Sequence, residues 1–216
     1  MKAKTPKRGD RSDTSIARYD AKRDFKRTPE PTAKRSATNS RSLRFVIQLH
    51  DASRLHYDFR LEAAGVLKSW AVPKGPSLDP AAKRLAMRVE DHPLAYRDFE
   101  GVIPKGNYGA GEVIVWDRGT YRPQTDVRPE KSIDDGEIKF TLRGKKLRGN
   151  FALVKMRARD GVENAWLLIK ERDDFVDKRW RATAHAESVK SGRTLDDIRR
   201  AKKVATWVSN RSSTEG

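Results

Sequence analysis

The chain contains 216 residues, of which 47 are Lys or Arg and 30 are Asp or Glu, so its formal net charge is +17. The absence of cysteine excludes disulfides and thiolate metal sites. No apolar run approaches the roughly 20 residues that a helix needs to span a bilayer, so we expect a cytoplasmic protein of one or two domains without membrane contact.

The positive charge is concentrated at the two ends of the chain. Residues 1–41 carry 13 basic and 5 acidic side chains, and residues 176–216 carry 10 and 5. The first segment has few large apolar residues, which predicts disorder as its default state. We interpret both segments as basic arms around a core of residues 42–175. Such arms favour a nucleic-acid partner and association with the nucleoid, and a pair of solvated tails is the alternative.

The stretch 45–61, FVIQLHDASRLHYDFRL, predicts a β-hairpin. In its second half, apolar residues alternate with His56, Asp58 and Arg60, which is the period-2 pattern of a strand. Its first half alternates in the same way and ends at His50. Each strand therefore has one apolar face and one polar face.

The register of this hairpin follows from its two faces. A five-residue loop over 51–55 places His50 opposite His56 and keeps both polar sets on one side, whereas a slip by one residue mixes the faces. Opposed Cβ atoms lie ~5 Å apart, so both imidazoles could bind one ion together with Asp58. This ligand set suits Mn, Fe or Zn, and Arg60 could form two bonds to a phosphate. A hydrogen-bonded histidine pair on a polar sheet face is the alternative.

A third histidine follows the next alternating segment. In residues 84–90 apolar and polar side chains alternate again, with Arg84 and Glu90 on the polar parity. Pro93 disfavours helix at His92. We therefore expect His92 at the end of this strand, on the same parity as the other polar residues.

The glycine-rich segment 103–111 could approach a phosphate closely, but it runs into a strand and lacks the GxxxxGK[ST] spacing of a P-loop. We interpret Tyr108 within it, and Trp116 in the following strand, as packing residues of the core or rim. Neither is interpreted as a surface on which bases stack.

The whole pattern predicts an all-β fold, a compact antiparallel sandwich or barrel with almost no internal helix. The charged residues on one parity favour a barrel with a charged mouth or interior. Residues 132–137 are expected to form a turn, and a capping box at Thr194 and Asp197 predicts a short basic helix over 195–207. The expected strands cover residues 45–50, 55–61, 66–72, 84–90, 112–116, 137–142, 149–156 and 165–170.

Together, several segments resemble a known family, the 3'-phosphoesterase domain of bacterial DNA ligase D, which also has stand-alone members. The resemblance covers about residues 20–172 and implies a compact antiparallel β-barrel. It also implies that the basic N-terminal arm is ordered over the active site from about residue 23. The matching segments are RDFKRTPEP from Arg23, FVIQLHDASRLHYDFRLE from Phe45, WAVPKGPS from Trp70, VEDHPLAY from Val89, GVIPKGNYGAG from Gly101, WDRGTY from Trp116, LRGNFALVKM from Leu147 and WLLIK from Trp166.

The resemblance implies a manganese-dependent hydrolase that processes 3' ends of DNA or of RNA/DNA primer-templates during nonhomologous end joining. Such an enzyme removes a 3'-terminal ribonucleoside and then hydrolyses the remaining 3'-phosphate to leave a 3'-hydroxyl. Co2+ or Zn2+ are alternatives to Mn2+. The chain shows no Lys-x-Asp-Gly adenylation motif, so we expect ligation to need a separate DNA ligase. We also expect a monomer, with a polymerase and a Ku-like end-binding protein as further partners.

The resemblance also implies roles for individual positions. It implies that His50, His56 and Asp58 bind the metal, and that Arg60 and His92 hold the scissile phosphate, with His92 placed to protonate or hydrogen-bond the leaving oxygen. The remaining catalytic, phosphate-binding or supporting positions that it implies are Arg23, Asp24, Glu30, Lys74, Arg84, Glu90 and Tyr96.

Two other classes of function are compatible with parts of the sequence. The first is a noncatalytic nucleic-acid-binding β-barrel, in which the basic arms provide the whole affinity. The second is a small-molecule metalloenzyme of cupin type, also a β-barrel with histidines on strands. The charge of +17 and Arg60 suit a polyanion better than a small neutral substrate.

Overall fold

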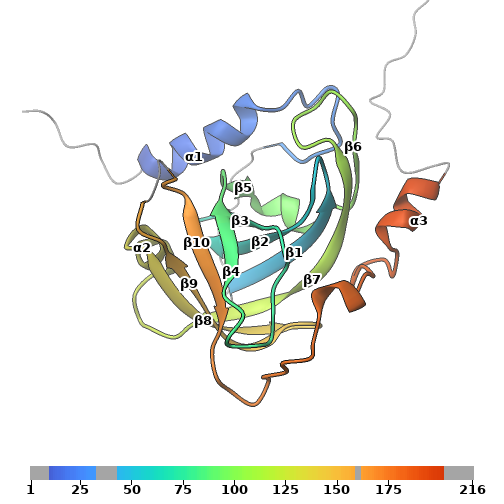
Figure 1. Ribbon diagram of the computed structural model, residues 1–216. Coiled ribbons are helices and arrows are strands. Elements are labelled where there is room, and N and C mark those ends of the chain that lie inside the picture. The colour runs from blue at the N-terminus through green and yellow to red at the C-terminus, as the bar shows by residue number, and fades with distance from the viewer. Residues whose placement is uncertain (1–9, 33–42, 159–161, 202–216) are drawn as a thin grey trace, which may run out of the picture.

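The computed structural model describes residues 10–32, 43–158 and 162–201. It confirms the predicted antiparallel β-barrel (Figure 1). The strands are β1 (Leu43–Asp51), β2 (Leu55–Ala63), β3 (Val66–Val72), β4 (Arg84–Arg88), β5 (His92–Pro93), β6 (Gly101–Ile103), β7 (Gly111–Pro123), β8 (Glu137–Gly144), β9 (Arg148–Lys155) and β10 (Ala165–Lys170). The helices are α1 (Asp10–Ala21), η1 (Leu94–Asp98), α2 (Pro129–Asp134), η2 (Ala182–Ala184) and α3 (Leu195–Arg200).

Eight strands form the closed barrel. They follow the order β1-β2-β3-β4-β10-β9-β8-β7, and pairing of β1 with β7 closes the circle. The short strands β5 and β6 pair with β3 and β7, outside this circle. Closure leaves the eight strands without a free edge, which removes the usual route to edge-to-edge aggregation.

The β1–β2 hairpin has the predicted register. His50 pairs with His56, and Gln48 pairs with Asp58. The ladder continues one pair beyond the prediction, to Asp51 and Leu55, so the loop is shorter than the five residues expected. The register itself is unchanged, so the side chains lie on the predicted faces. A shift of one residue would have exchanged the two faces.

The interior of the barrel is apolar. The inward residues of β1 and β2, such as Phe45, Ile47 and Phe59, are buried in one cluster with Trp116 of β7 and Phe140 of β8. The expectation of a charged interior is therefore wrong. The polar parity of β1 and β2 faces outward and is buried there by segments that pack on the outside of the barrel.

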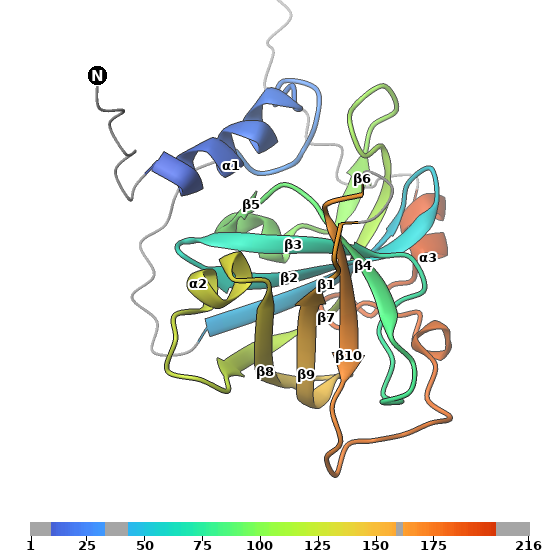
Figure 2. The same ribbon diagram turned by 60° about the vertical axis from the view of Figure 1, so that its left-hand side comes forward.

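A second, smaller apolar cluster lies on this outer face. It joins Tyr19 of α1, Val46 of β1, Leu67 of β3 and Tyr96 of η1. Helix α1 crosses the outside of the barrel above β3 and β5, as Figures 1 and 2 show. The outer face is therefore covered by α1 and its following residues and by the β5–η1 segment.

Helix α1 departs from the predicted disorder of the arm. Two apolar residues three positions apart, Ile16 and Tyr19, lie on one side of the helix and are both buried. Tyr19 also donates a hydrogen bond of 2.6 Å to the carbonyl of Pro31, which closes the segment between them. Residues 1–9 and 33–42 of the arm lie outside the described residues.

Two further differences concern short helices. Residues 132–137 are not simply a turn, because α2 begins at Pro129, a residue that favours the first helical position. Helix α3 has the expected capping box of Thr194 and Asp197 but ends at Arg200, and Ala201 is extended. Residues 202–207 of the expected helix lie outside the described part of the chain.

The described helices include none that is long and apolar enough to cross a membrane.

Candidate active site

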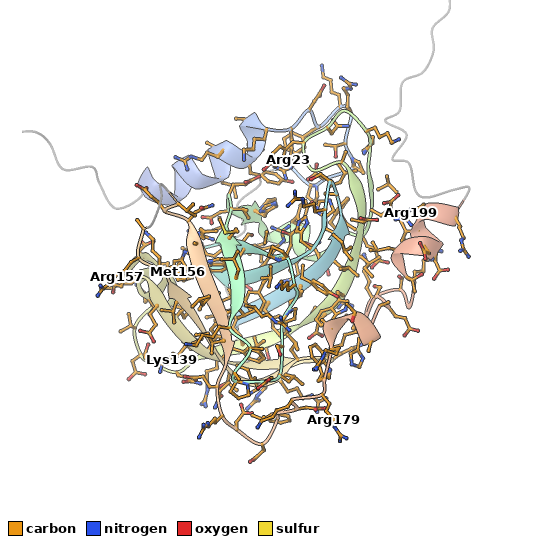
Figure 3. The ribbon with its side chains drawn as sticks, viewed as in Figure 1. Arg23, Lys139, Met156, Arg157, Arg179 and Arg199 are labelled. Atoms are coloured by element: carbon orange, nitrogen blue, oxygen red, sulfur yellow. The ribbon has the colours of Figure 1, made fainter. Side chains whose placement is uncertain are left out.

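A pocket of about 260 Å³ lies on the outer face of β1, β2 and β3. Its floor includes the outward residues His50, Asp58 and Arg60. Its walls come from residues that follow α1, from the segment between β4 and η1, and from the loop between β6 and β7. In Figure 3, Arg23 lies between α1 and the barrel strands, on this side of the molecule.

Three side chains of the floor form a candidate metal site. His50, His56 and Asp58 each offer a ligand atom, and these atoms lie within 4.8 Å of one another. Nδ1 of His50 lies 3.5 Å from Oδ2 of Asp58, and Nε2 of His56 lies 3.5 Å from Oδ1. The two imidazole rings have centroids 4.9 Å apart. The predicted register therefore brings all three heads together.

The second nitrogen of each imidazole fixes its tautomer. Nε2 of His50 lies 2.8 Å from the carbonyl oxygen of Gly109, and Nδ1 of His56 lies 2.8 Å from the carbonyl oxygen of Arg54. A carbonyl can only accept, so both of these nitrogens carry a proton and donate. The nitrogens that face Asp58 are thus left with free lone pairs, the arrangement that metal-binding histidines use.

The charge state of the triad also suits a cation. Burial raises the pKa of Asp58, but the charge of Arg60 and the two adjacent histidines outweigh it and hold this pKa well below its usual value. Burial lowers the pKa of His56, and Asp58 more than reverses this effect. An ionised carboxylate with two imidazoles is an N/O donor set that fits a divalent transition metal.

Arg60 is the best-partnered residue of the floor and is only 2% exposed. Its Nε donates to Oε1 of Gln48 at 2.8 Å, one Nη donates to Ser69 and the other to Asp58, each at 2.9 Å. Gln48 in turn donates to the carbonyls of Tyr96 and Phe99. The guanidinium is therefore held in place, and the η1 segment is bound to the barrel through the same network.

His92 reaches the pocket from β5, which pairs with β3, and not from the end of β4 as the sequence predicted. Its Nδ1 lies 2.9 Å from Nη1 of Arg60 and 3.0 Å from the carbonyl of Glu90. A guanidinium can only donate and a carbonyl can only accept, so the contact with Arg60 suits the tautomer with the ring proton on Nε2, and the contact with Glu90 suits the one with the proton on Nδ1. Burial, Arg60 and Arg23 together lower the pKa of His92 well below its usual value.

Arg23 approaches the same histidine from the opposite side. Its Nη2 lies 3.4 Å from Nε2 of His92, close enough to donate to that nitrogen when the ring proton lies on Nδ1. Its Nε is bound at 2.7 Å by Glu30, which also accepts from Thr28 and Tyr96. Arg23 thus places a guanidinium beside the triad, and such a group binds oxygen anions well.

The rim of the pocket contains Glu90, Lys22 and Tyr108. Nζ of Lys22 lies 3.1 Å from Oε2 of Glu90 and donates to the hydroxyl of Tyr108 at 3.2 Å. Glu90 also lies 3.6 Å from Nη1 of Arg23. The rim thus joins the N-terminal segment to the β6–β7 loop.

Three of the predicted positions lie outside the pocket. Asp24 is exposed and accepts a hydrogen bond from the backbone N–H of Lys26. Lys74 is exposed after β3. Arg84 lies on β4 opposite Leu168, and its buried Nε has no hydrogen-bond partner among the described residues. The remaining predicted positions, His50, His56, Asp58, Arg60, Glu90, His92, Tyr96, Arg23 and Glu30, line the pocket or bind a residue that does.

Sequence reasoning missed three residues of this region. Gln48 shares the polar parity and lies opposite Asp58, so its position in the hairpin could have identified it. Apart from its spacing from Ile16, nothing in the sequence indicated that Tyr19 is buried, because its partners come from distant segments. Tyr108 was interpreted as packing, but it lines the pocket and is 50% exposed.

Comparison with known proteins gives one family. The family model described as the DNA ligase D 3'-phosphoesterase domain matches residues 48–155. The multifunctional non-homologous end joining protein LigD of Pseudomonas aeruginosa is 51% identical over 188 residues, which cover 85% of this chain and 22% of that protein.

Mycobacterial proteins give the same result. LigD of Mycolicibacterium smegmatis is 43% identical over 73% of this chain, and that of Mycobacterium tuberculosis is 47% identical over 65%. The chain spans only 21% and 18% of these two relatives. The match includes the hairpin, the pocket floor and the β6–β7 loop, and the chain therefore belongs to the DNA ligase D 3'-phosphoesterase domain family.

Proposed function

We propose that this protein is a metal-dependent phosphoesterase that acts on 3' ends of DNA in nonhomologous end joining. In this proposal it removes a 3'-terminal ribonucleoside and then the 3'-phosphate, leaving a 3'-hydroxyl. One observation carries the proposal. The His50–His56–Asp58 triad, Arg23 and His92 open onto the same pocket.

The triad suits manganese as its metal. The set of two imidazoles and one carboxylate contains no thiolate and leaves coordination positions for substrate and water, and Co2+ or Zn2+ fit the same description. A divalent cation at this place would draw electron density from the phosphorus and offset the negative charge that accumulates during hydrolysis.

The protein's own donors would hold the phosphate. Arg23 and His92 would each donate to a nonbridging or leaving oxygen, because their Nη2 and Nε2 atoms face the same space. Arg60 would act at the floor, where it fixes Asp58 and His92 and adds positive charge. Since the pKa of His92 is lowered, its ring would be neutral at neutral pH, and with its proton on Nε2 it would donate a hydrogen bond from that nitrogen.

Tyr96 and Glu30 would support this arrangement from behind. The hydroxyl of Tyr96 donates to Glu30 at 3.0 Å, and its ring lies 4.9 Å from the guanidinium carbon of Arg60. Burial and the charge of Glu30 raise the pKa of Tyr96 well above its usual value, so the phenol keeps its proton. Glu90 would set the position of Arg23 and of Lys22 at the rim.

The test is a duplex primer that ends in one ribonucleotide, incubated with the protein and Mn2+. We expect a product shortened by one nucleoside with a 3'-phosphate, followed by a 3'-hydroxyl end, when the products are resolved by size and end group. His50→Ala removes a triad imidazole, and we expect both steps to slow by at least about a hundredfold.

His185→Ala is the matched control, because His185 is an exposed histidine outside the pocket. It should retain both activities. Undiminished turnover by His50→Ala would remove the triad from the mechanism. If the wild-type protein binds the primer end but removes neither a 3'-terminal ribonucleoside nor a 3'-phosphate, the noncatalytic nucleic-acid-binding barrel is favoured.

Partners belong to the same proposal. The relatives are named as multifunctional end-joining proteins, and this chain matches only about a fifth of their length. We propose that a DNA ligase or polymerase module and a Ku-like end-binding protein are partners at the same ends.

A further inference from the structure

We infer that Tyr108 is the surface against which the last nucleobase of the substrate packs, an inference that rests on the proposed function. Tyr108 lines the pocket, and half of its surface is exposed. Tyr96, which also lines the pocket, is buried and its ring contacts Arg60 and His92. Among the described residues of the pocket, Tyr108 is therefore the aromatic side chain that a ligand can reach.

The chemistry of the pocket determines which part of a nucleotide lies beside this ring. The floor and inner walls carry ionised or donating groups, namely Asp58, Arg60, His92 and Arg23. These groups suit a phosphate, and a cavity of about 260 Å³ cannot also enclose a nucleoside and its neighbour. The base attached to the phosphorylated sugar must then lie at the rim, where Tyr108 is.

The backbone holds Tyr108 in place without contributions from its own ring. The next residue, Gly109, has a φ of +72° and accepts the hydrogen bond from the triad residue His50. The preceding residue, Asn107, donates to the carbonyls of Arg27 and Pro104. The position of the ring is thereby tied to the position of the triad, which links placement of a base to placement of its phosphate.

Lys22 fixes the orientation of the ring. Its Nζ donates to the phenol oxygen at 3.2 Å and lies 4.4 Å from the ring centroid. This ammonium group anchors one part of the phenol while half of the side chain stays open to solvent. A rigid aromatic ring beside a positive charge is the arrangement with which proteins hold bases of any sequence, since every base offers a π-face.

The experiment compares two primers that both end in a 3'-phosphate. One carries a normal terminal nucleotide, and the other carries an abasic analogue at the same place. For Tyr108→Ala we expect the KM of the normal primer to rise by about tenfold, the loss of one base–aromatic stack. The kcat should change by less than about twofold, because a stack made equally in ground and transition states affects binding alone.

With the abasic primer, wild type and Tyr108→Ala should have the same KM within about twofold, since no base is present to stack. Tyr108→Phe keeps the ring and should stay close to wild type on the normal primer. Phe175→Ala is the matched control, because Phe175 is 47% exposed and lies outside the pocket. It should leave KM and kcat unchanged on both primers.

The outcomes separate this inference from the proposed function. If the wild-type protein releases no phosphate from either primer, the proposed function is wrong. The inference about Tyr108 is wrong, and the proposed function stands, if the wild type is active but Tyr108→Ala gives one of three results. These are an equal rise of KM on both primers, an unchanged KM on both primers, and a fall of kcat without a rise of KM.

Discussion

Phe59 and Arg60 are neighbours in β2 and are equally buried, at 1% and 2% exposure, but they are held by different forces. Phe59 faces the interior of the barrel, where its ring lies 5.9 Å from that of Phe140. Arg60 faces the pocket and donates hydrogen bonds to Gln48, Ser69 and Asp58. One sheet thus has an apolar face that stabilises the barrel and a charged face that forms the site.

Burial therefore has a different energetic effect on each face of the sheet. On the inner face, burial removes apolar surface from water, which is the main favourable term of folding. On the outer face, burial of charges costs free energy unless each charge has partners. Changes on the inner face should therefore act on the stability of the whole barrel, and changes on the outer face on local order and activity.

The largest expected effect is on the inner face. Phe59→Ala leaves a cavity beside Phe140 and should lower the free energy of unfolding by about 3–5 kcal/mol, measured by urea denaturation. Activity per folded molecule should survive at low temperature, because the polar side chains of β2 still face the pocket. The exposed Phe175→Ala is the control and should shift stability little. Equal losses in the two variants would contradict the comparison.

A smaller effect is expected where the N-terminal segment meets the outer face. Glu30→Gln keeps the volume but removes the charge that binds the buried Arg23 at 2.7 Å. We expect a loss of about 1–3 kcal/mol and faster proteolysis between Tyr19 and Pro31, while the barrel itself stays resistant. Exposed Glu163 gives the control, Glu163→Gln. Unchanged proteolysis would show that this ion pair does not hold the segment.

The two faces also differ in how well the sequence predicted them. The alternation in β1 and β2 was enough to give the register, and with it the His50–His56–Asp58 cluster, because a strand has only two faces and a slip would have buried the wrong one. The direction of the faces was not available from one hairpin. Which side becomes the interior depends on how all eight strands close, so the polar set was expected at the mouth or in the interior and in fact lies on the outer face.

The cover of the outer face was the hardest part to predict. His92 reaches the pocket through β5, a strand of two residues that no periodicity can reveal. Helix α1 has a single apolar pair in a basic arm, and its packing depends on Tyr96 and Phe99, about 80 residues away in the chain. Lys74 and Arg84 were implied by resemblance alone, and the structure places both outside the pocket.

The smallest expected effect concerns pH and again separates the two faces. The pKa of His92 is lowered by burial and by Arg60 and Arg23, and the charge of Asp58 and the Glu90 carbonyl oppose this shift without reversing it. Ser69, Tyr19 and Tyr96 complete the surroundings of the ring. Below the unfolded pKa of about 6.5, the unfolded chain binds a proton that the folded chain does not. Stability should therefore fall as the pH falls, and the inner face contributes nothing to this change.

Between pH 7 and pH 5.5 the wild-type protein should lose about 1 kcal/mol more of its unfolding free energy than His92→Asn, which has no ring to protonate. Chemical denaturation at the two pH values measures this difference. His185→Ala should keep the wild-type slope, because it removes a histidine that is exposed. Identical slopes for wild type and His92→Asn would mean that the folded protein protonates this ring as readily as the unfolded chain does.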